Sequence, residues 1–487
     1  MQLKARFLKI QTGGPSIVVV SPTVFKELGL EPMGRVRLMD DKKYVVAVIN
    51  ISETAKDDEI FLFEEVGNAL RVEEGEPITV IAEEMPRSLQ AIKKKMDGRA
   101  LSREEIYEIV SDIVDNRLTQ VELAYFAASA YLRDFSAEEV EHLTRAMAQT
   151  GEMLRLTARP IMDKHSIGGV PANRTTMVVV PIIAAAGLTI PKTSSRSITD
   201  PAGTADTMEV LAPVNFNLEE IKRIVRETRG CIVWGGGVDI APADDDIIQV
   251  EHPMQLDPTS MLLASIMAKK FAIGATDLLI DIPFGPGTKA TPARARELER
   301  KFLQLGKRLG INIRVIRTDG SQPIGHGIGP ILEARDVLWI LKNDKRQPKD
   351  LRKKAVMMAG LLLEMGGKAR RGAGRKLAEQ FLKSGKAWKK MRQIIKAQGG
   401  NPNINSDKLI PGHDTEVIKA HKSGKITAID NSLIKRAARY LGAPYDKGAG
   451  IYLYKHVGER VKLGEKLFTM YAESGHKLSD AIQFIER

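Results

Sequence analysis

Residues 163–169 read DKHSIGG and residues 194–209 read SSRSITDPAGTADTME, and an apolar segment separates these two polar turns. The apolar segment predicts a buried helix over residues 175–187, followed by a strand over residues 189–194. No membrane helix is predicted. The longest apolar stretch, residues 177–191, contains two prolines and one glycine, and it is shorter than the roughly 18 residues that a membrane span needs.

Strands and helices continue to alternate further along the chain. Predicted strands occupy residues 231–236, 277–283 and 311–316, and predicted helices occupy residues 218–228, 260–271 and 292–309. Alternation at this spacing predicts an α/β fold built on a parallel sheet. Ligands of such sheets bind beyond the carboxyl ends of the strands, which is where the glycine-containing turns lie.

Three regions are predicted around this central α/β domain, which we place at residues 161–344. Short β-rich runs separated by glycine turns predict an N-terminal barrel-like domain over residues 1–84. Helical patterns, two of them opened by Ser-x-x-Glu capping boxes, predict a helical subdomain over residues 85–160, to which residues 245–275 return. Residues 345–487 predict a C-terminal α+β domain that begins with basic helices. Its predicted strands occupy residues 425–430, 450–457 and 465–472.

The composition is that of a globular chain from a reducing compartment. Of the 487 residues, 43% are apolar and 28% are charged, which excludes a disordered or collagen-like chain. Cys231 is the only cysteine, so neither an internal disulfide nor a Cys-x-x-Cys metal site can form. The N-terminus also lacks the apolar block of a secretory signal, and we expect a cytoplasmic protein that does not bind membranes. The net charge of +12 favours anionic partners, either nucleic acid or small phosphorylated molecules.

The first turn has the composition of an anion-binding site. Lys164, Ser166 and the paired glycines Gly168 and Gly169 precede an apolar helix. A cation, free N–H groups and the helix dipole all favour a phosphate there. An ordinary glycine turn is the alternative for this segment taken alone. A Walker A loop is excluded, because every Gly-Lys pair in the chain is followed by Arg, Ala or Ile rather than by Ser or Thr.

The second turn places the hydroxyls of Ser194, Ser195, Thr199 and Thr204, an arginine and a glycine within eleven residues, which predicts a binding loop at the end of a strand. A capped surface turn is the alternative, but it would rarely place an arginine among so many hydroxyls. Two other segments carry candidate groups. Asp257 precedes the helix that contains Ser265, and an aspartate before a proline is usually an N-cap. Lys289 ends the glycine-rich segment FGPGTK and is either an exposed lysine or a second phosphate contact.

Together, the motifs of residues 163–169 and 194–209 resemble the signature of the pyrimidine nucleoside phosphorylase family, and more closely its archaeal-type AMP phosphorylase branch. The resemblance covers nearly everything after Pro86, and an additional N-terminal β-rich domain is a feature of that branch. It implies a helical subdomain and a larger α/β domain with a cleft between them. It also implies a reaction in which inorganic phosphate displaces the base of a nucleotide. For AMP the implied products are adenine and ribose 1,5-bisphosphate, with CMP and UMP as further substrates.

The resemblance also implies a role for each matching position. The positions that hold phosphate are Lys164, Ser166, Thr175, Ser194 and Thr204. The positions that hold the nucleotide are Gly169, Ser195, Arg196, Ser197, Ile198, Thr199, Asp200, Thr204, Ser265 and Lys289. Asp257 matches the proton donor, a role for which burial must raise its pKa. Inorganic phosphate is the implied co-substrate, with no cofactor and no metal, and the implied assembly is a homodimer through the helical subdomain or a larger homo-oligomer.

Four departures from the pyrimidine nucleoside enzymes affect the choice of substrate. Val250 stands where those enzymes place a base-reading arginine, so their pyrimidine recognition cannot operate here. Lys289 occupies a position that is apolar in those enzymes, and a cation there can receive a 5'-phosphate. Both changes favour a nucleotide over a nucleoside. The two other departures argue against this conclusion. Ser197 replaces a small apolar residue of the signature, and Asp200 places an anion beside loops that are expected to bind phosphate.

Three other functions fit parts of the sequence, and a pyrimidine nucleoside phosphorylase is the nearest of them. A phosphoribosyltransferase of the anthranilate type shares the architecture but needs carboxylates that hold magnesium on pyrophosphate. The acidic run at residues 244–246 is the only acidic cluster near the glycine loops, and it predicts a solvated turn. The basic runs KNDKRQPKDLRKK and KARRGAGRK suggest RNA binding, but they lack interleaved aromatics for stacking. No HExxH or GxSxG motif indicates a metallohydrolase or a serine hydrolase.

Overall fold

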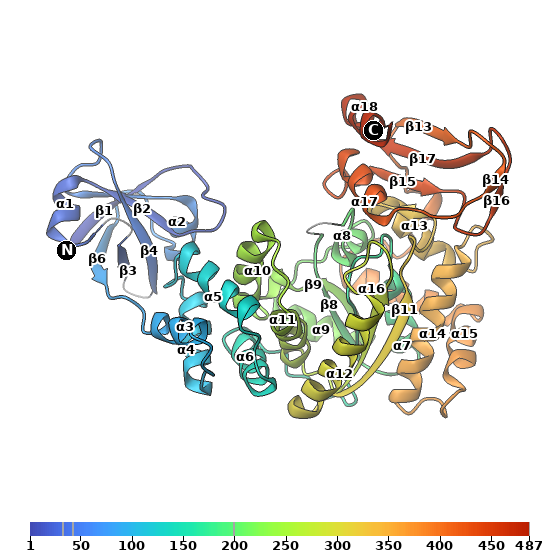
Figure 1. Cartoon of the computed structure of the whole chain (residues 1–487), viewed down its shortest axis with the longest axis horizontal. Helices are drawn as coiled ribbons and strands as arrows, with labels where there is room; N and C mark the ends of the chain where they lie inside the picture. The colour runs from blue at the N-terminus through green and yellow to red at the C-terminus, as the bar shows by residue number, and fades with distance from the viewer. Residues whose placement is uncertain (32–33, 41–42, 198–199, 487) are drawn as a thin grey trace. The chain divides into compact units, whose positions relative to one another are not determined.

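The computed structural model of the chain describes residues 1–31, 34–40, 43–197 and 200–486 (Figure 1). The chain divides into two compact units. The first unit comprises Met1–Gly151 and Ala241–Ala268, and the second comprises Glu152–Ile240 and Lys269–Arg487. The α/β class predicted from the sequence is confirmed, with a helical bundle, a parallel α/β sheet, a C-terminal domain and an N-terminal barrel.

The N-terminal barrel is closed, with strand order β1-β5-β2-β4-β3-β6 (Figure 1). Apolar side chains such as Val36 and Leu38 are fully buried, as period-two alternation requires when one face of each strand lines the core. Two short helices, α1 (Pro22–Glu27) and α2 (Glu64–Leu70), complete the barrel domain. The strands are β1 (Gln2–Phe7), β2 (Ile17–Val20), β3 (Arg35–Asp40), β4 (Lys43–Ile51), β5 (Glu59–Leu62) and β6 (Pro77–Glu83).

Capping boxes start three of the four helices that directly follow the barrel. The predicted boxes of Ser102 with Glu105 and of Ser136 with Glu139 are both formed. A third box, Thr119 with Glu122, starts α5 at Gln120. The helices of this unit are α3 (Ser88–Met96), α4 (Arg103–Val114), α5 (Gln120–Leu132), α6 (Ala137–Gln149) and α10 (Pro242–Met254). Helix α11 (Thr259–Ala272) continues from this unit into the second one.

The second unit is built on a parallel sheet, as the alternation of strands and helices predicts. Strand β10 lies between β7 and β11, strand β8 pairs with β9, and all three pairings are parallel. A parallel bridge between Ile161 and Thr189 connects the segments that lead into β7 and β8. The strands are β7 (Met162–Ser166), β8 (Ile190–Ser194), β9 (Gly230–Trp234), β10 (Asp277–Phe284) and β11 (Asn312–Asp319).

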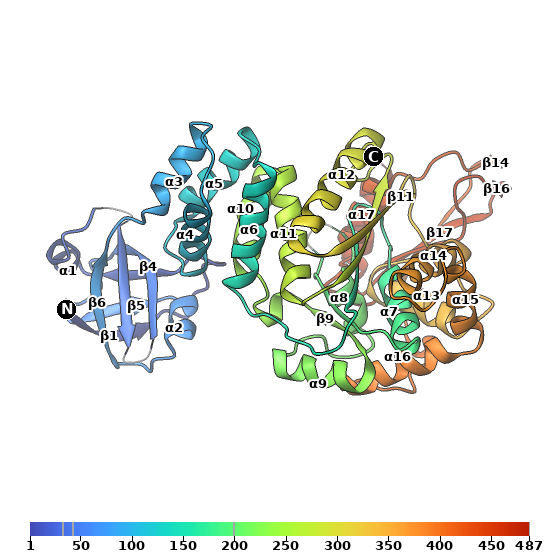
Figure 2. The same ribbon diagram turned by 90° about the horizontal axis from the view of Figure 1, so that it is seen from below.

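Helix α7 (Thr175–Ala185) forms the centre of the core of this unit. Its side chains from Thr175 to Ala184 are buried on every side, which explains why it is apolar without amphipathic periodicity. It lies against α14 (Lys349–Met365) and α16 (Lys386–Ala397), as Figure 2 shows. The other helices of this unit before residue 400 are α8 (Thr204–Glu209), α9 (Leu218–Thr228), α12 (Pro292–Leu309), α13 (Pro330–Leu341) and α15 (Gly374–Lys383).

The C-terminal sheet is antiparallel, with order β12-β15-β17-β13, and the helices α17 (Asn431–Tyr440) and α18 (Gly475–Glu486) belong to this region. The strand predicted at residues 425–430 is wrong. Ile426 and Ile429 are three residues apart, so they cannot share one face of a strand, and that segment has no strand beyond Lys425. The strands are β12 (Gly327–Ile328), β13 (Asp414–Lys419), β14 (Gly424–Lys425), β15 (Gly450–Leu453), β16 (Arg460–Val461) and β17 (Lys466–Ala472). No helix in the described part of the chain has the length and apolar character of a membrane span.

Candidate active site

The carboxyl ends of β7, β8 and β10 bring the predicted loops of the second unit to one edge of the parallel sheet. Gly169 follows β7 with a φ of +97°, a backbone conformation that side chains other than glycine rarely adopt. A Cβ atom at this glycine would lie 3.0 Å from the backbone nitrogen of Lys289 and 3.0 Å from Cα of Thr288. The first turn and the FGPGTK loop therefore touch, and two predicted nucleotide-binding positions, Gly169 and Lys289, are neighbours.

Lys164 lies inside strand β7 and is 2% exposed, so the first four residues of the DKHSIGG motif are strand rather than turn. Its Nζ donates hydrogen bonds to Oγ1 of Thr175 at 2.9 Å and to Oγ1 of Thr176 at 3.1 Å. Burial lowers the pKa of Lys164 from its usual range to about 7. The ammonium group is therefore balanced between its charged and neutral forms near neutral pH, and a nearby anion would favour the charged form.

A chain of hydrogen bonds connects the predicted phosphate-binding hydroxyls. Thr175 donates from Oγ1 to Oδ1 of Asn173 at 3.1 Å, and Nδ2 of Asn173 donates to Oγ of Ser166 at 3.0 Å. Ser166 in turn donates from Oγ to Oδ2 of Asp281 at 2.7 Å. Lys164, Ser166 and Thr175 are thus held in one network. Asn173 and Asp281 hold this network together by hydrogen bonds, and neither is among the site residues predicted from the sequence.

Asp281 is a fully buried carboxylate in strand β10. Besides Ser166, it accepts a hydrogen bond from Oγ1 of Thr318 at 2.6 Å and forms an ion pair with Nζ of Lys354 at 2.8 Å. Burial acts to raise the pKa of Asp281, but the positive charges of Lys354 and Lys164 outweigh burial and lower it. The sequence does carry a signal for this residue, because a charged side chain interrupts the apolar run DLLIDIP.

The second turn follows β8 and contains a buried polar atom without a partner. Oγ of Ser194 is buried and has no hydrogen-bond partner within the described residues. Such an atom is costly unless a ligand or water satisfies it, which is consistent with its predicted contact to phosphate. Ser195 is exposed, and its carbonyl oxygen would lie 2.5 Å from a Cβ at Gly203, so the two ends of this turn pack closely. The predicted positions Ile198 and Thr199 lie outside the described residues.

Arg196 is engaged by acidic side chains of α8, the helix that follows its loop. Its guanidinium donates two hydrogen bonds to Glu209, at 2.6 and 2.9 Å, and one to Oδ1 of Asp206 at 3.2 Å. It also lies 5.0 Å from the ring centroid of Trp234. Ser197 donates its backbone N–H to Oδ2 of Asp206 at 2.8 Å. These contacts shape the loop, and the nucleotide-binding roles of Arg196 and Ser197 stay predictions.

Asp200 has a cationic partner from the C-terminal region. Nζ of Lys435, on α17, lies 3.6 Å from Oδ1 of Asp200. From the sequence alone, the negative charge of Asp200 is expected to repel phosphate. The positive charge of Lys435 offsets that negative charge. The same helix fixes the neighbouring loops, because Nδ2 of Asn431 donates to the carbonyl oxygens of Gly320 at 2.8 Å and Pro286 at 3.4 Å.

Asp257 and Ser265 belong to the first unit, whereas the other described site residues belong to the second. Asp257 lies two residues before α11 and is exposed, so the burial that its predicted role requires is not present in this structure. Ser265 is half-buried within α11, and Val250 is buried in α10. The proton-donor role of Asp257 and the nucleotide contact of Ser265 stay predictions.

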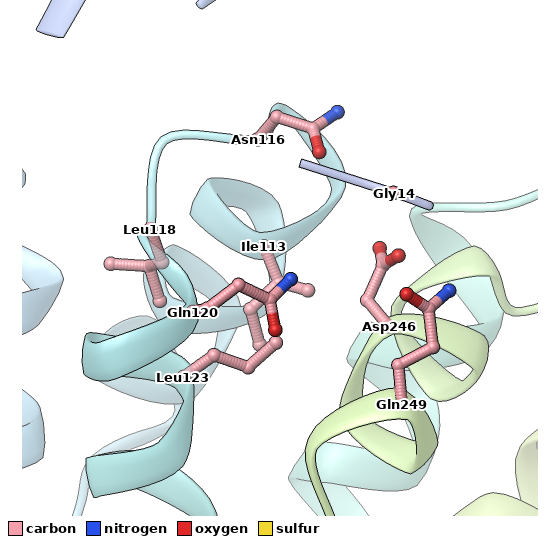
Figure 3. Close-up of a pocket in the computed structure, with 8 residues that line it drawn as sticks. All are labelled: Gly14, Ile113, Asn116, Leu118, Gln120, Leu123, Asp246 and Gln249. Atoms are coloured by element: carbon pink, nitrogen blue, oxygen red, sulfur yellow. The ribbon is translucent and has the colours of Figure 1, made fainter. Parts of the chain in front are cut away.

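The acidic run at residues 244–246 is not a solvated turn, which corrects the prediction. It lies in the first turns of α10, where Asp244 is buried. Burial and the charge of Asp245 raise the pKa of Asp246 to about 6. Asp246 and Gln249 face α5 across a pocket of about 20 Å³ in the first unit, which has room for little more than a water molecule (Figure 3). Its lining residues are Gly14, Ile113, Asn116, Leu118, Gln120, Leu123, Asp246 and Gln249, none of which is a predicted site residue.

Models of known protein families match three parts of the chain. Residues 89–151 match the helical bundle domain of a glycosyl transferase family, and residues 158–245 match the α/β domain of the same family. Residues 425–487 match the pyrimidine nucleoside phosphorylase C-terminal domain. The order of these domains, together with the lysine and hydroxyls at the sheet edge, defines a glycosyl transferase of the nucleoside phosphorylase class.

Relatives that match over nearly their full length identify a specific family within this class. The chain is 48% identical to an AMP phosphorylase from Thermococcus kodakarensis over 100% of this chain and 97% of that protein. It is 47% identical to an AMP phosphorylase from Pyrococcus furiosus, also over 100% of this chain and 97% of that protein. The chain belongs to the AMP phosphorylase family. Anthranilate phosphoribosyltransferase from Thermus thermophilus shares the fold, with a TM-score of 0.55 and 21% identity over 64% of this chain and 99% of that structure.

Proposed function

We propose that this protein catalyses the phosphorolysis of AMP, releasing adenine and ribose 1,5-bisphosphate, with CMP and UMP as further substrates. The full-length identity to AMP phosphorylases supports the reaction. The observation that carries the proposal within the structure is the buried Lys164 with its hydroxyl network at the sheet edge. Such a set of donors suits an oxyanion better than a neutral ligand.

The chemistry requires an anion at the sugar and a proton for the base. Cleavage of a glycosidic bond passes through an oxocarbenium-like state, so a phosphate oxygen must be held against the anomeric carbon as the bond to adenine breaks. Lys164, Thr175 and Ser194 would hold that phosphate and convert an encounter into an oriented attack. Asp257 would give its proton to the departing base. Inorganic phosphate is the co-substrate of this scheme, which uses no cofactor and no metal.

Adenine release should depend on phosphate and not on magnesium. Incubated with AMP, the full chain should release free adenine in phosphate buffer and should release almost none in a buffer without phosphate. Excess EDTA should leave the rate unchanged, because the donors proposed to hold phosphate are side chains and backbone groups. Chromatography of the free base measures both effects. Release without phosphate would indicate hydrolysis, and loss of activity in EDTA that magnesium restores would indicate a metal-dependent transferase.

Lys289 should distinguish nucleotides from nucleosides. It is exposed next to Gly169, where it is proposed to bind the 5'-phosphate. Removing a charge-assisted contact costs about 1.5–3 kcal/mol, so Lys289→Ala should lower kcat/KM for AMP by roughly 10- to 100-fold. The rate with adenosine should change little. The matched control is Lys307→Ala, which removes an exposed lysine of α12. An equal loss with both substrates would show that Lys289 does not bind the 5'-phosphate.

Self-association through the helical subdomain is part of the proposal. Helix α5 exposes Val121 by 54%, Tyr125 by 52%, Tyr131 by 59% and Leu132 by 67%. A row of large apolar side chains on one exposed helix is typical of a surface that a partner covers. A second copy of the chain is the partner that the family resemblance implies. Sedimentation equilibrium of the full chain measures this assembly.

A cytoplasmic location is also proposed. Cys231, the only cysteine in the sequence, is buried in β9, and burial raises the pKa of its thiol to about 12. A thiol of this kind is inert to oxidation and fits a chain that folds without disulfides. Fractionation of the cells that produce the protein tests the location.

A further inference from the structure

Arg174 connects the start of α7, which follows the first turn, to the second turn of the candidate site, although the sequence motifs do not point to it. It directly precedes α7, next to Thr175, and is 8% exposed. Its Nη2 donates to the carbonyl oxygen of Ala202 at 2.6 Å, and its Nη1 donates to Oγ1 of Thr204 at 3.0 Å. An arginine at the start of α7 therefore holds the backbone and a hydroxyl of the second turn.

A buried carboxylate keeps the guanidinium in this orientation. Nε of Arg174 donates to Oε2 of Glu333, on α13, which is 1% exposed. Glu333 also accepts hydrogen bonds from Oγ1 of Thr207 at 3.0 Å and from the backbone N–H of Gly329 at 3.1 Å. With both oxygens engaged, the carboxylate has a single orientation, and the three donors of Arg174 are aimed at fixed partners.

The direction of the bond to Thr204 determines what that hydroxyl can do. A guanidinium only donates hydrogen bonds, so Oγ1 of Thr204 must be the acceptor in this pair. The hydroxyl hydrogen of Thr204 is then left for another acceptor, and none is recorded for it among the residues described. Thr204 is half-buried, so the group that takes this hydrogen can come from solvent or from a ligand. Of the ligands in the proposed reaction, phosphate is rich in acceptor oxygens.

We propose that Arg174 is a positioning residue for the phosphate co-substrate: it fixes the second turn against the start of α7 and makes the Thr204 hydroxyl donate to a phosphate oxygen. This inference rests on the proposed phosphorolysis. Lysine cannot replace arginine in this role, because an ammonium group lacks the planar fork that reaches Glu333, Ala202 and Thr204 together.

The test is a double-mutant cycle between Arg174 and Thr204, with KM for phosphate as its measure. Arg174→Lys keeps a charge beside Glu333 and should fold, while raising KM for phosphate about tenfold with a smaller change in kcat. Thr204→Val should raise KM by a similar factor. In the Thr204→Val background, Arg174→Lys should add less than about twofold, because the hydroxyl that Arg174 orients is gone. The inference would be overturned if the double variant raised KM by the product of the two single-variant factors. It would also be overturned if Arg174→Lys left KM unchanged.

Thermal unfolding separates this role from a loss of structure. Arg352→Met is the matched control, because Arg352 also makes three side-chain contacts, with Asn343, Gln347 and Glu379, and none of these is a site residue. It should leave KM for phosphate unchanged.

The increase in the midpoint of thermal unfolding on adding orthophosphate measures phosphate binding without turnover. It should be large in the wild type and in Arg352→Met and small in Arg174→Lys. If phosphate stabilises the wild type but AMP is not cleaved, the proposed function fails while the role of Arg174 is still measured. Equal stabilisation of all three proteins would overturn the role of Arg174 alone.

Discussion

Asp257→Asn should lower kcat for AMP phosphorolysis by roughly 10²- to 10⁴-fold, the usual contribution of a general acid. Asparagine has nearly the shape of aspartate but no ionisable proton to give to the departing adenine. The expected loss is in turnover, because phosphate and the 5'-phosphate are proposed to be bound by other residues. Single-turnover release of adenine measures the chemical step, and stabilisation of the protein by AMP against heat measures binding.

The choice of asparagine separates the catalytic role from the ordinary structural one. An aspartate just before a proline at a helix start commonly serves as an N-cap, and asparagine caps helices as well as aspartate does. Asp257→Asn should therefore leave the thermal midpoint unchanged. The matched control is Asp245→Asn, an exposed position on α10 in the same unit. Full turnover by Asp257→Asn would remove the proton-donor assignment. Equal losses of turnover in Asp257→Asn and Asp245→Asn would show that the lost negative charge, rather than proton transfer, lowers the rate.

Local sequence patterns predicted most of the fold. Ser102 and Ser136 start α4 and α6 because each pairs with a glutamate three residues later, which is a contact within one turn of chain. Strand β1 is harder to recognise from the sequence, because Leu3 and Ala5 point into the barrel but alternate with polar and charged neighbours. The strand predicted at residues 425–430 is wrong because its two large apolar residues, Ile426 and Ile429, are not spaced to share one face of a strand.

The parts of the site that could not be predicted depend on contacts between distant positions. Ser166 and Asp281 are 115 positions apart, and Arg174 and Glu333 are 159 positions apart. Asp281 interrupts an apolar run and Glu333 stands among other charged residues of its helix, and only the folded chain reveals what each acid pairs with. The motifs identified the groups proposed to touch the ligand. The residues that orient those groups, among them Asn173, Asp281 and Arg174, became visible through hydrogen-bond geometry.

Affinity for the attacking anion should fall as the pH rises through about 7, because burial lowers the pKa of Lys164 to that value. A lysine below its pKa carries the positive charge that attracts an oxyanion, and above its pKa it is neutral. The attraction is therefore present on the acidic side and is lost on the alkaline side, and bound anion moves the transition to higher pH by favouring the charged form. Orthophosphate itself titrates in this range, so sulfate, which keeps its charge, is the better probe. Its inhibition constant against phosphate should rise between about pH 6 and about pH 9.

Lys164→Met and Lys164→Arg separate the charge of this residue from its packing. The methionine variant keeps the apolar stem but removes the ammonium group, so KM for phosphate should rise by roughly 10- to 100-fold and sulfate inhibition should no longer vary with pH. Asp281 retains Lys354 at 2.8 Å in that variant, so its carboxylate is not left unpaired. Arginine stays charged over the whole range, so a folded Lys164→Arg should bind sulfate with little pH dependence. If Lys164→Met retained the pH dependence of the wild type, the titrating group would be a different one, and the buried lysine would hold the strand rather than the phosphate.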